Sequence, residues 1–123
     1  MRTLLVVEDE FAIAEGLKAV LEDAGYRAAT APNGRAALEL MRQSRPDAVI
    51  VDLMLPVMSG LLMLRAMADD PALRDLPVLV ITALATPVAR LQIGPDRPLL
   101  TKPFRVDAFL EAVAALFPEP APG

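Results

Sequence analysis

Reactive side chains follow two short apolar runs in the first half of the chain. Residues 4–7 are followed by Glu8 and Asp9, and residues 48–51 are followed by Asp52. Short apolar runs of this kind are typical of strands buried on both faces of a sheet. Three carboxylates at such strand ends would repel one another, and a hard cation such as Mg²⁺ removes that repulsion. Each acid alone is also explained as a helix cap or a strand end.

The second half of the chain adds a hydroxyl and an ammonium at equivalent places. Thr82 ends the apolar run 78–81, and Lys102 follows another short run, with Pro103 after it. Ligands of open parallel sheets bind at the carboxyl ends of the strands. We therefore expect Thr82 and Lys102 at the same edge as the acids, where the ammonium could hold an anionic oxygen. Taken singly, each is also explained as a solvated charge or a helix cap.

Composition excludes several classes of chemistry. The 123 residues predict one domain, and 54% of them are hydrophobic. The chain has no histidine and no cysteine, which excludes imidazole bases, thiolate metal sites and disulfides. A cysteine-free chain without a signal peptide favours the cytoplasm. The net charge of −4 argues against direct nucleic-acid binding, and no apolar run is long enough to cross a membrane.

Helical patterns fill the gaps between the apolar runs. We expect a weak second strand at residues 26–30 and helices from Asp9 to Gly25, from Asn33 to Pro46, from Ser59 or Gly60 to Asp70, from Thr86 to Gly94, and from about Arg105 to Phe117. Repeated β-α order with right-handed crossovers predicts a doubly wound parallel α/β sheet of five strands. The domain is expected over 1–117, followed by a proline-rich tail at 118–123.

The fourth helix differs from the others. Thr86 is expected as its N-cap and Pro87 as its first residue, and Gly94 and Pro95 end it. At most about two turns fit between these signals, so we expect a short or irregular helix.

Together, the four motifs resemble the receiver domain of two-component response regulators, which is similar in architecture to the chemotaxis receiver protein. The resemblance rests on residues 4–10, 52–60, 80–83 and 101–104, and it covers nearly the whole chain. It implies a flavodoxin-like sheet with strand order 2-1-3-4-5. It also implies a signalling domain rather than an enzyme.

The resemblance assigns a phosphorylation site and a metal site. Asp52 would accept a phosphoryl group from a sensor histidine kinase or a histidine phosphotransfer protein. Asp9, Asp52 and the backbone carbonyl of Met54 would ligate Mg²⁺, with Glu8 acting through water. The metal and the Lys102 ammonium would neutralise the oxygens of a loose phosphoryl-transfer transition state, and Asp52 would be the nucleophile.

It also assigns the groups that sense the phosphoryl. Thr82, followed by the small Ala83, would bind the phosphoryl group, Lys102 would pair with one of its oxygens, and the peptide bond to Pro103 would be cis. The output would be altered binding of a downstream effector protein, or a phosphorylation-dependent homodimer.

One position departs from the family. Receiver domains place an aromatic residue three positions before the lysine, and here that residue is Leu99. An aromatic switch is therefore absent, and we expect the segment 84–97 to report phosphorylation through a change in order. The departure keeps a phosphorylation-independent interaction module open as the alternative function. A dehalogenase-like phosphohydrolase is disfavoured, because Met54 stands where such enzymes place a second acid. Phe11, outside the inward stripe of the first helix, is expected to be partly exposed.

Overall fold

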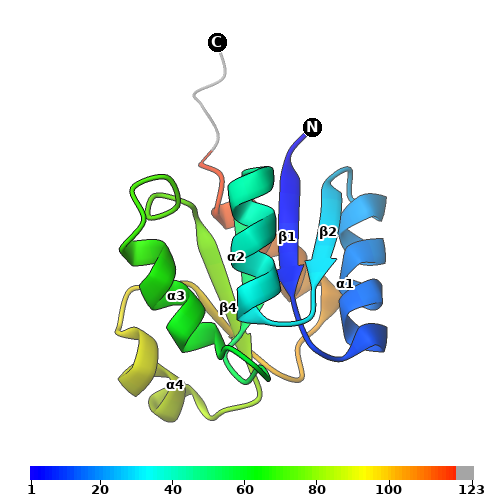
Figure 1. Cartoon of the computed structure of the whole chain (residues 1–123). Coiled ribbons are helices and arrows are strands. Elements are labelled where there is room, and N and C mark those ends of the chain that lie inside the picture. Colours follow the sequence, from blue (N-terminus) through cyan, green and yellow to red (C-terminus); the bar gives the residue numbers. More distant parts are fainter. Residues whose placement is uncertain (119–123) are drawn as a thin grey trace.

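Five strands alternate with five helices in the computed structural model, which describes residues 1–118 (Figure 1). The strands are β1 (Thr3–Val7), β2 (Arg27–Ala31), β3 (Ala48–Asp52), β4 (Val78–Thr82) and β5 (Leu99–Thr101). The helices are α1 (Phe11–Asp23), α2 (Gly34–Gln43), α3 (Gly60–Ala68), α4 (Thr86–Ile93) and α5 (Val106–Ala115). The sheet is parallel throughout, in the order β2-β1-β3-β4-β5. The predicted fold is confirmed, while all but the first residue of the expected tail lies outside the described residues.

The three central strands owe their position to continuous apolar sequence. Every residue of β3 and β4 is buried, as are four of the five in β1. The register pairs Val7 with Val51 and Asp52 with Ile81, so β1, β3 and β4 end nearly level. Their carboxyl ends, and the polar residues that follow them, therefore meet at one edge of the sheet, the lower edge in Figure 1.

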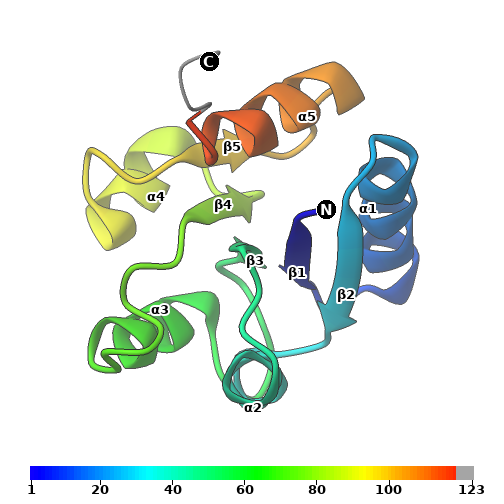
Figure 2. The same cartoon turned by 90° about the horizontal axis from the view of Figure 1, so that it is seen from above.

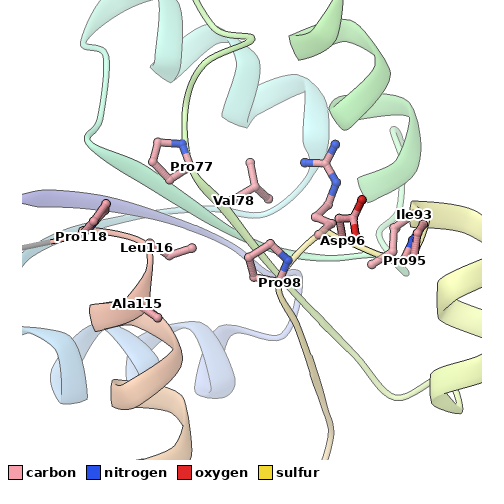
Figure 3. Close-up of a pocket in the computed structure, with 10 residues that line it drawn as sticks. Pro77, Val78, Ile93, Pro95, Asp96, Pro98, Ala115, Leu116 and Pro118 are labelled. Carbon is pink, nitrogen blue, oxygen red and sulfur yellow. The ribbon is translucent and has the colours of Figure 1, made fainter.

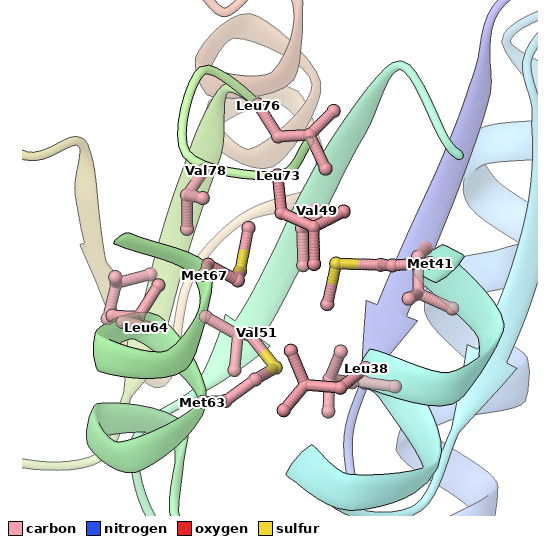
Figure 4. Packing of buried hydrophobic residues seen from close by; sticks show 14 of the residues in the cluster. Leu38, Met41, Val49, Val51, Met63, Leu64, Met67, Leu73, Leu76 and Val78 are labelled. Atoms are coloured by element: carbon pink, nitrogen blue, oxygen red, sulfur yellow. The ribbon is translucent and has the colours of Figure 1, made fainter. Parts of the chain in front are cut away.

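Helices cover both faces of the sheet and enclose two separate apolar cores (Figure 2). The core under α2, α3 and α4 is rich in methionine, and Figure 4 shows Met41, Met63 and Met67 around Val49 and Val51. The core under α1 and α5 contains Leu17, Leu21, Phe109, Val113 and Phe117. The alternating faces of the strands therefore separate the two cores.

Two helices begin as the sequence predicts, and α1 does not. The side chain of Asn33 accepts a hydrogen bond from the Ala36 N–H at 2.9 Å, and Ser59 caps α3 in the same way. The prediction of Asp9 as the cap of α1 is wrong, because the N-cap is Glu10, whose side chain makes no capping bond. The first turn of α1 is therefore left without a side-chain cap.

Helix α4 is as short as predicted but starts differently. Its N-cap is Ala85 rather than Thr86, because Thr86 already has helical geometry and Pro87 lies in the first turn. The helix has eight residues. At its other end, Nη1 of Arg90 donates to the carbonyl oxygens of Gly94 at 3.2 Å and Arg97 at 2.6 Å. This side chain ties the end of α4 to the segment that leads into β5.

Smaller differences concern element boundaries and burial. Strand β2 starts at Arg27, one residue later than expected. In α3 the buried residues include Met63, while Leu61, which was expected to face inward, is half-buried. No helix within residues 1–118 combines the length and apolar character needed to cross a membrane.

The loop between β3 and α3 is held in two unusual ways. Val57 has φ 63°, and the N–H of Met58 donates to the Pro56 carbonyl at 2.6 Å, which closes a tight three-residue turn. A branched residue is strained at positive φ. At the end of the loop, a Cβ on Gly60 would lie 2.3 Å from the backbone oxygen of Asp52. Only glycine therefore allows α3 to start against the end of β3.

Replacing Val57 by glycine is expected to stabilise the protein. Its side chain is 72% exposed, so little packing is lost, and glycine adopts positive φ without strain. We expect the free energy of unfolding to rise by about 1 kcal/mol, to be measured by urea denaturation. Val57→Ala keeps a Cβ and is expected to gain much less. An equal gain from both variants would contradict the strain at this turn.

An alanine substitution is expected to have opposite effects at two glycines. Gly60→Ala must displace the end of β3 and is expected to cost about 2 kcal/mol or more in unfolding free energy. Gly16→Ala is the matched control within α1, where a Cβ meets nothing within 4 Å, and it should stabilise by about 0.5–1 kcal/mol. Urea denaturation of both variants tests this, and a tolerated Gly60→Ala would contradict the close approach.

Candidate functional site

Lys102 lies at the centre of the polar residues at the strand ends. Its Nζ is 2.6 Å from Oε1 of Glu8 and 2.8 Å from Oδ2 of Asp52. Both carboxylates are buried, with residue exposures of 3% and 6%. Three groups from the ends of β1, β3 and β5 therefore meet, and the structure brings together these predicted site residues.

Asp52 is held through both of its carboxylate oxygens. Oδ1 accepts a hydrogen bond from the Met54 N–H at 2.9 Å, while Oδ2 is the oxygen bound by Lys102. The backbone of Asp52 is fixed by the ladder of β3 and by the contact with Gly60 described above. The side chain of Asp52 is therefore held in one orientation at the carboxyl end of β3. The role of Gly60 in this constraint was missed from sequence, where the glycine marks only a helix start.

The charges around Lys102 do not balance. Burial raises the pKa of Glu8; the hydrogen bond and charge of Lys102 offset this only in part, and the carboxyls of Asp9 and Asp52 add to the rise. Burial lowers the pKa of Lys102, but its hydrogen bonds to Asp52 and Glu8 and their charges outweigh that effect, so its pKa is raised overall. Lys102 therefore stays charged at neutral pH, and the site retains excess negative charge.

Asp9 occupies a different position from the other two acids. It follows Glu8 at the end of β1 and is exposed. Among residues 1–118, no three acidic side chains are arranged as a ready metal-binding cluster. Within residues 1–118, Lys102 is the cation that pairs with Glu8 and Asp52, while the Asp9 carboxyl lies within hydrogen-bond distance of Glu8 and adds to the rise of its pKa. Asp9 and Met54, which is 60% exposed, nevertheless border the buried acids and are open to solvent.

Thr82 is fully buried at the end of β4. Its hydroxyl accepts a hydrogen bond from the Leu84 N–H at 3.1 Å, and Ala83 between them is exposed. The backbone oxygen of Thr82 accepts from the Lys102 N–H at 2.7 Å. The hydroxyl thus lies one strand away from Asp52, beside the backbone of Lys102.

The segment around Lys102 joins the site to the core. The Lys102–Pro103 peptide bond is cis. Leu99 pairs with Val80 in the sheet and packs, half-buried, against the core under α2, α3 and α4. The structure therefore places an aliphatic side chain where receiver domains carry an aromatic one.

An apolar hollow adjoins Lys102 on the side of α1. It has a volume of about 470 Å³ and is lined by Ile13, Ala83, Lys102, Pro103 and Phe104. Phe11, at the start of α1, is 80% exposed, which agrees with its expected exposure. Sequence reasoning did not assign Ile13 or Phe104 to the site, because their apolar types indicate only core packing.

Known proteins with similar sequences are response regulators. Residues 4–114 match the response regulator receiver domain family. The response regulator MprA of Mycolicibacterium vanbaalenii is 38% identical over 122 residues, which cover 97% of this chain and 52% of MprA. The polar-differentiation response regulator DivK of Brucella anthropi is 32% identical, with 91% and 93% of the two chains covered. The chain thus spans about half the length of MprA and nearly all of DivK.

Solved structures with the same architecture are also receiver domains or response regulators. The chemotaxis response regulator CheY4 of Vibrio cholerae superposes with a TM-score of 0.87 at 28% identity, covering 95% of this chain and 99% of that one. The receiver domain of a signal transduction histidine kinase from Syntrophus aciditrophicus has a TM-score of 0.86 at 34% identity, covering 94% and 89%. With the sequence match over residues 4–114, the conclusion is that this chain belongs to the response regulator receiver domain family of two-component signalling.

Proposed function

We propose that this protein is a phospho-accepting receiver that takes a phosphoryl group onto Asp52 and thereby changes its binding to a partner. The carrying observation is the double anchoring of Asp52, with Oδ1 on the Met54 N–H and Oδ2 on Lys102. A carboxylate fixed in one orientation at the carboxyl end of a strand is a suitable nucleophile. Family membership supports the same chemistry, since two-component receivers are signalling domains.

The donor in this proposal is a phosphohistidine on another protein, because this chain has no histidine. A carboxylate oxygen of Asp52 forms a bond to phosphorus as the phosphorus–nitrogen bond breaks. The bonding electron pair stays on the imidazole nitrogen, and the product is an acyl phosphate on Asp52. A sensor histidine kinase or a histidine phosphotransfer protein would supply the group.

The residues at the strand ends fit a magnesium ion chemically. Glu8 and Asp52 share one ammonium, which leaves one negative charge in excess before Asp9 is counted, and burial and the neighbouring acids raise the pKa of Glu8. Asp9, Asp52 and the Met54 carbonyl would hold the ion, with Glu8 acting through water, since Mg²⁺ prefers oxygen ligands and retains several waters. When bound, Mg²⁺ supplies positive charge for the phosphoryl oxygens.

Lys102 and Thr82 would respond to the new phosphoryl group. The Lys102 ammonium already lies 2.8 Å from Oδ2 of Asp52, so a phosphoryl oxygen attached there falls within its reach. Thr82 would exchange its hydrogen bond with the Leu84 N–H for one to the phosphoryl, past the small side chain of Ala83. Leu99 would follow with a smaller apolar movement than an aromatic ring makes, and the reporting segment 84–97 stays a prediction.

This proposal assigns a surface to one of two kinds of partner. The hollow lined by Ile13, Pro103 and Phe104, together with the exposed Phe11, borders Lys102 and would receive the phosphohistidine donor. The downstream partner is an effector protein or a second copy of this chain. The cytoplasmic location expected from sequence stays a prediction.

Intact-mass measurement tests the phosphorylation site. Incubation with acetyl phosphate and Mg²⁺ is expected to add a single phosphoryl group, because only Asp52 combines burial with two anchored oxygens. Asp52→Ala should abolish the addition, and Asp75→Ala, an exposed aspartate far along the chain, should leave it unchanged.

A failure of that reaction would change the assignment. If acetyl phosphate adds no phosphoryl group and beryllofluoride does not bind, the phosphorylation-independent interaction module is favoured. The aliphatic Leu99 also favours that module. Addition that persists in Asp52→Ala would place the acceptor elsewhere.

Lys102→Met tests the counter-charge. The variant leaves Glu8 and Asp52 buried without a cation. We expect its free energy of unfolding at neutral pH to be lower by about 2 kcal/mol, a figure that allows for solvent screening because the Lys102 side chain is 21% exposed. The pKa of Glu8 is raised in the folded state, so protonation of its carboxyl favours folding. The loss of stability in the variant should therefore be smaller at about pH 5 than at about pH 7. Urea denaturation at both pH values measures this.

The matched control is Lys18→Met, at the other lysine of the chain, which forms no ion pair within the described residues. We expect it to change stability little at either pH. Equal stabilities of the two lysine variants at neutral pH would contradict the role of Lys102 as the counter-charge.

A further inference from the structure

A second hollow lies away from the strand ends, between α3 and α4. It has a volume of about 180 Å³, and its apolar walls are Leu61, Leu64 and Ala68 from α3 and Ile93 from α4. Figures 1 and 2 both show α3 and α4 as neighbours on the same side of the sheet. A hollow of this size accommodates a large apolar side chain rather than a small-molecule ligand.

Two guanidinium groups line this hollow. Arg65 projects from α3 and Arg97 from the segment between α4 and β5, and neither forms an ion pair with any residue in 1–118. The neighbouring polar groups are Gln92 in the hollow and Asp96 beside Arg97. Two unpaired cations beside apolar walls, on a chain with net charge −4, make a local surface whose charge is opposite to that of the whole protein.

The backbone that carries Arg97 is held in place. Nη1 of Arg90 bonds the carbonyl oxygens of Gly94 and Arg97, as described for the end of α4. The guanidinium of Arg97 is therefore presented from a fixed backbone beside Ile93. A preformed arrangement of this kind lowers the entropic cost of binding a partner.

The apolar surface continues past Arg97. A larger hollow of about 580 Å³ shares Ile93 and Arg97 with the first one and extends under Pro95 and Pro98 to the end of α5 (Figure 3). Figure 3 shows Ile93 and Pro95 on one side of it and Leu116 and Pro118 on the other. The two hollows together form an elongated surface, which suits a peptide segment.

We propose that the surface between α3 and α4 binds an acidic amphipathic helix of a partner protein. A large apolar side chain of that helix fills the hollow between Leu64 and Ile93, and its carboxylates pair with Arg65 and Arg97. Helices in grooves are recognised by apolar anchors at i and i+4 with complementary charges around them. This surface is separate from Asp52 and from the hollow beside Lys102, so it holds whether or not Asp52 is phosphorylated.

The test uses a synthetic peptide and the whole chain. The probe is a fluorescent peptide of about 15 residues with leucines on one helical face and glutamates on the other, and its matched control carries lysines in place of glutamates. Anisotropy measures affinity, and amide chemical shifts of the protein locate the site. We expect shifts concentrated in α3, α4 and residues 94–97, and the lysine peptide should bind at least about tenfold more weakly.

Charge reversals decide whether the two arginines carry the recognition. Arg65→Glu and Arg97→Glu should each weaken the acidic peptide about tenfold, while Arg27→Glu, the same change on the far edge strand β2, should weaken it less than about twofold. Arg97→Gln, which removes the charge without reversing it, should give an intermediate affinity.

Several results would overturn the proposal. These are no binding of the acidic peptide, shifts spread over the surface, or an equal loss in Arg27→Glu, which would indicate general electrostatic attraction. Inorganic phosphate that shifts the same amides as strongly as the peptide would mark an anion site instead. Loss of peptide binding would leave phosphorylation of Asp52 intact, so the two proposals fail separately.

Discussion

The attraction between Lys102 and two buried carboxylates is the interaction on which the arrangement of the strand ends depends. Asp52 ends β3, while Glu8 and Lys102 directly follow β1 and β5. These strands lie far apart in sequence, yet the charged groups meet within 2.6–2.8 Å. Burying two carboxylates is unfavourable unless a cation accompanies them. A single ammonium faces two carboxylates, so the three groups together carry a net negative charge when both acids are ionised. Stability and chemistry are therefore linked through the same side chains.

The loop that follows Asp52 is held by backbone constraints as well as by the packing of its apolar side chains against the core. Gly60 lets α3 begin against the carbonyl of Asp52, and the N–H of Met54 fixes one carboxylate oxygen. Val57, two residues after Leu55, is held at positive φ and exposed. Strained conformations persist where surrounding structure over-determines them, and they concentrate near functional sites. The Asp52 carboxylate is thus presented by a constrained loop, part of which is exposed to solvent.

Much of this architecture could be predicted from sequence because the signals were strong and local. The apolar runs that end in Asp52 and Thr82 are long enough to mark buried strands, and Asn33 and Ser59 are effective helix caps. The cap of α1 was misplaced because Asp9 and Glu10 are both acidic neighbours, and only backbone geometry separates them. Pairing of Lys102 with Glu8 depends on distances across the sheet, which no spacing in the sequence reveals. The positive φ of Val57 is likewise invisible, since valine is a poor residue for that conformation.

The division of the interior into two cores has a mechanical consequence. The core beneath α2 and α3 contains three buried methionines, whereas the stacked rings of Phe104 and Phe109 lie on the side of α5. Unbranched thioether side chains can change rotamer and fill altered gaps, which ring systems do less readily. The half of the domain that carries the Asp52 loop, Leu99 and the surface between α3 and α4 therefore has the more adaptable core. Side chains there can repack with fewer steric restrictions than the rings packed beneath α5.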